Sequence, residues 1–350
     1  MSRKKQIAAA GAGVALVAAG AGAAEALRRH RDERVEVPGK TLTGSLEWTP
    51  TTETAVRTED GVTLHVEIDE PSTPRAGAPT VVLLHGFTIS RRAWVFQRRA
   101  LTQAGYRVLT YDHRGHGRSG SGDAEHATIA QLGRDLRRVI DQIAPEGPLV
   151  LVGHSMGGMT MMAFGETSAD LIGTRVVGAV FMATSAGGEG QLISLGYGAM
   201  VGRLIANYGP GALGRLSRQE RFLRSLRRFG RDVEDYFVYH YSFSSRISRT
   251  LLRYTGDLAF ETPFATLSGF ISTFNDHDRR GSLKVWGAVP TLVITAADDR
   301  LTPADHGAVI ARSIPGAESV IVRSSGHMVM LEHADFINEE LLEFLDKVAE

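Results

Sequence analysis

The sequence predicts an α/β fold in which a mostly parallel sheet is flanked by helices and carries an inserted helical cap. Short apolar strands alternate with amphipathic helices, and the strands are apolar along their whole length. Such strands are typical of a sheet that is covered on both faces. The alternation stops over residues 186–285 and then resumes, and an interruption of this size is too long for a loop. We therefore expect these residues to form the cap.

The 350-residue chain is long enough to bury one large core, and its pattern divides it into four parts. We predict a basic, Ala/Gly-rich segment over residues 1–34 and a tether over residues 35–55. The α/β core then comprises residues 56–185 and 286–350, with the cap between them.

The N-terminal segment contains an uncharged stretch, residues 7–24, which the basic residues 3–5 precede. As a helix this stretch would span roughly 27 Å, close to the thickness of a bilayer core. It is therefore interpreted as a transmembrane helix that anchors the protein in a membrane. A signal peptide that is cleaved on secretion and a disordered arm are the alternatives. Arginines follow the stretch as well, so the membrane topology stays open.

Net charge and cysteine content exclude several classes of function. The formal net charge is zero, so we expect no nucleic-acid partner. The chain has no cysteine, which excludes disulfides, thiolate metal sites and a cysteine nucleophile. The absence of cysteine does not fix the compartment, and the oligomeric state is unknown from sequence.

The first part of the core begins with a hairpin over residues 56–68, turning at Asp60-Gly61. The alternating elements then follow in the order strand 80–84, helix 91–104, strand 106–111, helix 127–143, strand 149–152, helix 156–166 and strand 175–182. Right-handed crossovers place the loops that follow these strands on one edge of the sheet. Ligands bind at that edge in open α/β sheets.

The last part of the core resumes the same alternation with strand 290–296. A helix over 303–314 follows, with Thr302 as its cap and Pro303 at its first position. Strand 319–323 and one long amphipathic helix over 328–348 complete the chain.

Ser155 is the candidate nucleophile. It lies in Gly153-His154-Ser155-Met156-Gly157, between an apolar strand and a helix, which is the G-x-S-x-G pattern of a nucleophile elbow. The serine of such an elbow sits in a strained turn, and side chains at Gly153 or Gly157 would collide with the neighbouring strand and helix. An ordinary tight turn is the alternative, so the remaining chain has to supply partners for the hydroxyl.

A histidine and a carboxylate at other strand ends complete a triad. Of the twelve histidines, His327 is best placed because it follows Gly326 directly after the last predicted strand. Asp298 and Asp299 both follow strand 290–296, and adjacent side chains diverge, so only one can face the histidine. We favour Asp299 as the acceptor, with Asp298 as a turn-forming residue.

Two backbone N–H groups are candidates for an oxyanion hole. Met156 follows the nucleophile at a helix N-terminus, and Phe87 follows His85-Gly86 at the end of a neighbouring strand. The Phe87 side chain is expected to shape the acyl pocket. This chemistry requires no metal and no organic cofactor.

The order of these motifs over residues 55–349 resembles the α/β-hydrolase superfamily. The motifs are His85-Gly86-Phe87, Asp112-x-Arg114-Gly115-His116-Gly117-x-Ser119, Gly153-His154-Ser155-Met156-Gly157-Gly158, Asp299-Arg300-Leu301-Thr302-Pro303 and Gly326-His327. The resemblance implies Ser155 as nucleophile, Asp299 as acid and His327 as base, with the Phe87 and Met156 amides in the oxyanion hole. It assigns His113 and His116 no catalytic role.

Within the superfamily, Gly-His-Ser-Met-Gly-Gly resembles the serine esterase and monoacylglycerol-lipase-like branch. This branch implies hydrolysis of small or lipid-like carboxylic esters through an acyl-enzyme. A membrane association through residues 7–24 would suit a lipid substrate. Three alternatives stay open: a perhydrolase or haloperoxidase-like enzyme, a carbon–carbon bond hydrolase with the same triad, and a non-catalytic ligand-binding protein. The acyl length and the alcohol are not given by the sequence.

Overall fold

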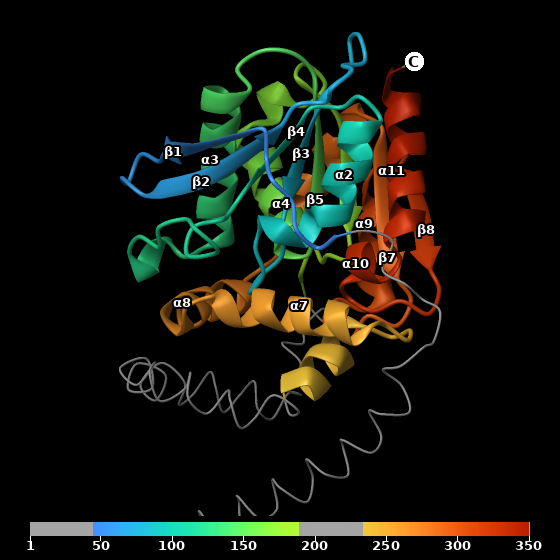
Figure 1. The fold of residues 1–350 in the computed structure, drawn as a ribbon. Helices are drawn as coiled ribbons and strands as arrows, with labels where there is room; N and C mark the ends of the chain where they lie inside the picture. Colours follow the sequence, from blue (N-terminus) through green and yellow to red (C-terminus); the bar gives the residue numbers. More distant parts are fainter. Residues whose placement is uncertain (1–44, 189–233, 350) are drawn as a thin grey trace, which may run out of the picture.

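A computed structural model describes residues 45–188 and 234–349 (Figure 1). At its centre lies an eight-stranded sheet with the order β1-β2-β4-β3-β5-β6-β7-β8. β1 and β2 are antiparallel to their neighbours, and the pairs from β4 to β8 are all parallel. This arrangement confirms the predicted fold class. The strands are β1 (Thr52–Arg57), β2 (Thr63–Asp69), β3 (Thr80–Leu84), β4 (Val108–Tyr111), β5 (Leu149–His154), β6 (Val176–Met182), β7 (Thr291–Ala296) and β8 (Glu318–Val322).

Helices cover both faces of the sheet. One apolar cluster packs α2, α10 and α11 on one face, and a second packs α3, α4, η5 and α9 on the other. Every residue of β4, β5 and β7 is buried between these layers, which explains why these strands are apolar throughout. The helices are η1 (Arg91–Trp94), α2 (Val95–Gln103), η2 (Ala124–His126), α3 (Ile129–Ile143), α4 (Met156–Thr167), η3 (Ala169–Leu171), α7 (Arg249–Glu261), α8 (Phe264–Asn275), η5 (Arg280–Ala288), α9 (Ala304–Ser313), α10 (Val329–Glu332) and α11 (Ala334–Ala349).

The described part of the cap region lies against the loops that follow the strands. In Figure 1, α7 and α8 run below the sheet in gold and orange. Thr262, between these helices, donates its hydroxyl to the Thr88 carbonyl after β3 at 2.8 Å. Thr266 of α8 donates to the Gly115 carbonyl after β4 at 3.0 Å. The cap residues 189–233 lie outside the described residues.

Three elements differ from the sequence prediction. β1 begins at Thr52, inside the expected tether, because Thr52 pairs with Ile68 of β2 at the edge of the sheet. The expected long C-terminal helix is interrupted at His333, whose backbone (φ −125°, ψ 47°) is not helical. The helix after β7 has Pro303 as its N-cap, because the Thr302 hydroxyl is engaged elsewhere.

The expectation of a membrane-spanning helix is wrong for the part of the chain that the structure describes. Across residues 45–188 and 234–349, no helix has both the length and the apolar character that a bilayer crossing requires. Even α11 has only 16 residues, whereas a span takes about 20. The stretch 7–24, on which the anchor and signal-peptide interpretations rest, lies outside the described residues. Membrane association is therefore without support.

Candidate active site

Ser155 occupies a strained turn between β5 and α4. Its backbone has φ 52° and ψ −117°, a region that side-chain-bearing residues rarely adopt. The glycines on either side have no room for a side chain. A Cβ on Gly157 would lie 2.2 Å from the Leu84 carbonyl oxygen of β3, and a Cβ on Gly153 would lie 2.6 Å from the Gly157 carbonyl carbon. The collisions expected from the sequence are therefore present.

His327 and Asp299 form a buried pair after β8 and β7. His327 Nδ1 lies 2.8 Å from Asp299 Oδ2, and the histidine is 6% and the aspartate 5% exposed. Asp299 Oδ1 also accepts the amides of Leu301, at 2.8 Å, and Thr302, at 3.0 Å. Burial raises the pKa of Asp299, but His327 and these two amides outweigh burial and lower the pKa below its usual value. The carboxylate is therefore ionised and holds His327 with Nδ1 protonated.

The structure places Asp299, and not Asp298, against His327. Asp298 turns toward the cap segment and accepts the Ser244 hydroxyl at 2.8 Å. Thr302, which the sequence predicts to be a helix cap, is a site residue. Its hydroxyl instead donates to Asp299 Oδ2 at 2.8 Å. The spacing of three residues between Asp299 and Thr302 is the only sequence signal that could have indicated this contact.

His154, which precedes the nucleophile, contacts the loop that carries His327. His154 Nε2 lies 2.8 Å from the His327 carbonyl oxygen, and the two ring centroids are 4.8 Å apart. Burial lowers the pKa of His154 to about 3, so the ring is neutral and donates its Nε2 proton. Within the described residues no hydrogen bond joins Ser155 Oγ to His327 Nε2. Catalytic hydrogen bonds are often long in unliganded structures, so the serine–histidine contact stays a prediction.

The two predicted oxyanion donors belong to segments that flank Ser155. Met156 is the first residue of α4, so its amide has no acceptor within the helix. A Cβ on Gly86 would lie 3.1 Å from Ser155 Cβ, which places the segment before Phe87 beside the nucleophile. His85 Nδ1 lies 2.7 Å from the Gly86 carbonyl oxygen. Because a trans peptide opposes its C=O and N–H, the Phe87 amide points away from His85.

Two histidines without an expected catalytic role support this region. The His113 amide donates to His85 Nε2 at 2.9 Å, which fixes the His85 tautomer with the proton on Nδ1. His116 lies edge-on to the Phe87 ring, with centroids 5.8 Å apart. Burial lowers the pKa of His85 and His116 to about 3, so both rings are neutral.

Aromatic side chains of α8 pack around the Phe87 ring. The Phe87 ring lies 6.1 Å from the Phe270 ring and 5.0 Å from the Phe274 ring, both of α8. Met156 and Met159 of α4 belong to the same buried cluster. Helix α8 of the described cap region therefore packs against Phe87, and the role of the Phe87 side chain in an acyl pocket stays a prediction.

One cluster of potential metal ligands lies in the first two strands. The side-chain ligand atoms of Glu53, His65 and Glu67 lie within 4.8 Å of one another. Glu67 already pairs with Arg91 at 2.5 Å and with Arg98 at 2.6 Å. Since arginine charges neutralise the carboxylate, the cluster is an ion-pair network and fits a metal ion poorly.

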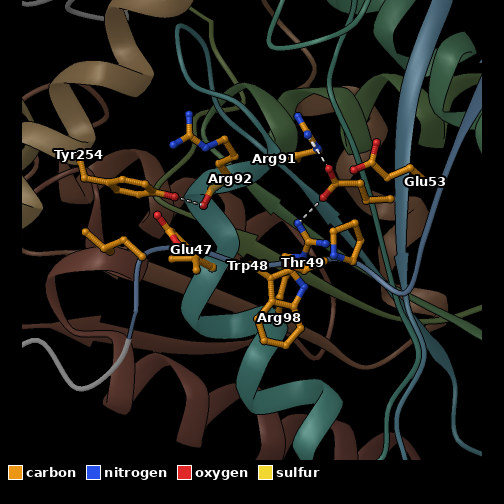
Figure 2. Close-up of a pocket in the computed structure, with 12 residues that line it drawn as sticks. Glu47, Trp48, Thr49, Glu53, Arg91, Arg92, Arg98 and Tyr254 are labelled. Carbon is orange, nitrogen blue, oxygen red and sulfur yellow. Dashed lines mark hydrogen bonds and ion pairs between the residues drawn. The ribbon is translucent and has the colours of Figure 1, made fainter.

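A cavity of about 360 Å³ lies next to this network (Figure 2). Figure 2 shows Trp48, Arg92 and Tyr254 around it, and Tyr254 donates its hydroxyl to the Arg92 carbonyl at 2.7 Å. None of the predicted triad or oxyanion residues lines it. The cavity is therefore separate from the candidate active site.

Comparisons with known proteins identify the family to which this fold belongs. A family described as "alpha/beta hydrolase fold" matches residues 79–334. A 2-hydroxy-6-oxononadienedioate/2-hydroxy-6-oxononatrienedioate hydrolase of Cupriavidus pinatubonensis is 31% identical over 280 residues, covering 77% of this chain and 88% of the relative. A hydrolase of Escherichia coli K12 with the same name is 29% identical over 297 residues, covering 82% and 93%.

Solved structures show the same fold. A bromoperoxidase from Bacillus anthracis has a TM-score of 0.64 at 24% identity, covering 84% of this chain and 100% of its own. A putative aryl esterase from Burkholderia cenocepacia has a TM-score of 0.66 at 23% identity, covering 85% and 99%. From the match over residues 79–334 and the shared architecture, the chain belongs to the α/β-hydrolase fold family.

Proposed function

We propose that the protein is a serine hydrolase in which Ser155 attacks a carbonyl carbon, His327 is the base and Asp299 orients the imidazole. One observation carries the proposal. The buried Asp299–His327 pair and the strained Ser155 turn lie at the same edge of the sheet, and His154 ties the two together. A non-catalytic binding protein would not need an ionised carboxylate held against a buried histidine.

The proposed mechanism uses these groups in sequence. His327 Nε2 takes the Ser155 proton as Oγ attacks the carbonyl carbon. The Met156 and Phe87 amides stabilise the negative oxygen that forms. His327 then protonates the leaving group, and water attacks the acyl-enzyme with His327 as base again. The products are a carboxylic acid and the protonated leaving group.

For the substrate class we favour ketones whose carbon–carbon bond is hydrolysed. The name of the two relatives describes a molecule with carboxylates, an enol and a ketone, but without an ester or amide. Its hydrolysis must therefore break a bond between the ketone carbon and a neighbouring carbon. The enol first tautomerises to the 2-oxo form, in which its proton ends on the carbon next to the ketone. The electron pair of the breaking bond then passes through the remaining double bond to the 2-oxo oxygen, which takes up a proton to give a 2-hydroxydienoic acid. The predicted serine esterase branch finds no support in these names.

Carboxylic esters are a second candidate, favoured by the apolar side chains around Phe87. The Phe87 ring packs against Phe270 and Phe274, and these apolar surroundings of the Phe87 and Met156 segments suit an apolar acyl group. An ester and a ketone share the first half of the mechanism and differ only in the leaving group. The two candidates therefore require different substrates to separate them.

A fluorophosphonate probe tests the serine mechanism. We expect the wild-type protein to be labelled, Ser155→Ala to remain unlabelled, and Ser90→Ala to be labelled like the wild type. Ser90 is a suitable control because it is also a buried serine, 2% exposed. An unlabelled wild-type protein would defeat the mechanism and support a ligand-binding role.

Two substrate sets then decide the leaving group. Loss of the absorbance of a 2-hydroxy-6-oxo-dienoic acid measures carbon–carbon hydrolysis, and p-nitrophenyl esters of increasing chain length measure ester hydrolysis. We expect the larger kcat/KM for the dienoic acid. A labelled protein that cleaves only the esters would replace the first candidate by the second.

A further inference from the structure

Glu332 carries a buried carboxylate that binds backbone amides from two separate segments. It is the last residue of α10 and is 8% exposed. Oε1 accepts the amide of Ser244, at 2.8 Å, and also that of Ser245. Oε2 accepts the amide of Gly326 at 2.6 Å. Within the described part of the chain the carboxylate forms no ion pair, so amides alone stabilise its charge.

The two segments are the cap and the loop of the candidate base. Ser244 and Ser245 lie in the cap region before α7, whereas Gly326 directly precedes His327. One carboxylate therefore bridges the cap to the catalytic loop. Because each oxygen serves a different segment, neither segment can shift without losing a charge-assisted hydrogen bond.

Further backbone contacts between the cap and the loop of His327 restrict the movement of both segments. The Met328 amide donates to the Ser242 carbonyl at 2.9 Å. A Cβ on Gly326 would lie 2.6 Å from Phe243 Cα, so the two backbones are in direct contact. Gly326 and Met328, the residues directly before and after His327, therefore both contact cap segment 242–245.

We propose that Glu332 is a positioning residue that makes the placement of His327 depend on the seating of cap segment 242–245. The inference rests on the proposed role of His327 as base. A carboxylate is suited to this task because both of its oxygens accept hydrogen bonds. A glutamine keeps the shape, but its NH2 group would face an N–H donor at one of the two segments.

Kinetics of three variants test the positioning. Glu332→Gln removes one acceptor, Glu332→Asp keeps the charge but shortens the reach, and Glu339→Gln makes the same chemical change at an exposed site on α11. We expect both Glu332 variants to lose about 10- to 100-fold in kcat and in fluorophosphonate labelling rate, because a small misplacement of a catalytic group has effects of that size. KM should change less than threefold, and Glu339→Gln should match the wild type.

Hydrogen–deuterium exchange provides a readout that does not depend on activity. In Glu332→Gln the amides of residues 242–248 and 325–328 should exchange faster together, while those of the β1–β2 hairpin keep their wild-type rates. Unchanged exchange at both segments would overturn the inference. Faster exchange throughout the protein would also overturn it, because Glu332 would then be a general stabilising residue.

The labelling rates and the exchange rates together separate the positioning role of Glu332 from the proposed serine mechanism. A labelled wild type with a Glu332→Gln variant labelled at the wild-type rate would remove the positioning role and leave the serine mechanism intact. An unlabelled wild type would remove the mechanism and with it the role toward a base. The exchange result would then still decide whether Glu332 joins the two segments.

Discussion

His154 Nε2 donates a hydrogen bond to the carbonyl oxygen of His327, 2.8 Å away, although 173 residues separate the two in sequence. The residue before the candidate nucleophile thus holds the backbone of the candidate base. Burial lowers the pKa of His154 to about 3, so this donor keeps the same protonation state throughout the neutral range. The contact fixes one side of the His327 loop, and Glu332 fixes the other.

Replacing His154 by phenylalanine should separate this tether from packing. His154→Phe keeps an aromatic ring edge-on to Trp94 but removes the donor to the His327 carbonyl. We expect kcat to fall about 10- to 100-fold with a smaller change in KM, because the base is displaced while the binding surface persists. His126→Phe, at a partly exposed position, is the control. Steady-state kinetics with wild-type kcat in His154→Phe would refute the tether.

The adjacent aspartates offer a matched pair. Asp299→Asn should reduce kcat by about 10³- to 10⁴-fold, because the neutral amide cannot stabilise the imidazolium or hold the required tautomer. Asp298→Asn removes only a charge that accepts the Ser244 hydroxyl, so the expected loss is below about tenfold. Steady-state kinetics of the two variants measures both losses in kcat. Equal losses in the two variants would contradict the assignment of Asp299.

The elbow glycines can be tested through stability. Gly157→Ala places a Cβ 2.2 Å from the Leu84 carbonyl oxygen, and backbone has to move to relieve the overlap. We expect the free energy of unfolding to fall by about 1–3 kcal/mol, as for other overpacked sites. Gly281→Ala is the control, because its Cβ would have no neighbour within 4 Å. Urea unfolding curves measure the difference, and equal midpoints would speak against the steric constraint.

The fold, the strained turn at Ser155 and the Asp299–His327 pair could be predicted because their signals are local in sequence. The apolar strand before Ser155, the glycines around it and the glycine before His327 each lie within a few residues of the side chain they mark. The divergence of adjacent side chains showed that only one aspartate could face His327, and the resemblance to the family motif favoured Asp299, which the structure places there.

The supporting contacts could not be predicted because their partners are distant in sequence. His154 and Glu332 bind backbone groups 173 and 88 residues away, and a backbone acceptor or donor leaves no mark on residue identity. Local propensity favours Thr302 as a helix cap. Its hydroxyl instead donates to Asp299, because a buried carboxylate has to be hydrogen-bonded. The prediction of a transmembrane helix rested on the composition of residues 7–24 alone, without a second signal in the sequence.

The buried histidines predict how stability changes with pH. Burial lowers the pKa of His85, His116 and His154 to about 3 and that of His277 to about 4, whereas the unfolded chain has values near 6.5. Between pH 4 and 6.5 the unfolded state therefore binds more protons, so stability rises with pH and is lost as the pH falls below about 6.5. Each such histidine contributes about 1.4 kcal/mol per pH unit within that window.

Urea unfolding between pH 5 and pH 7 measures this slope. His277→Gln should reduce the pH dependence by about one proton, because glutamine can still donate to the Ser185 carbonyl that His277 Nε2 contacts at 2.9 Å but does not titrate. A free energy of unfolding that is equal at pH 5 and pH 7 would show that these rings accept protons in the folded state, and the neutral, donating form of His154 would then be lost at mildly acidic pH.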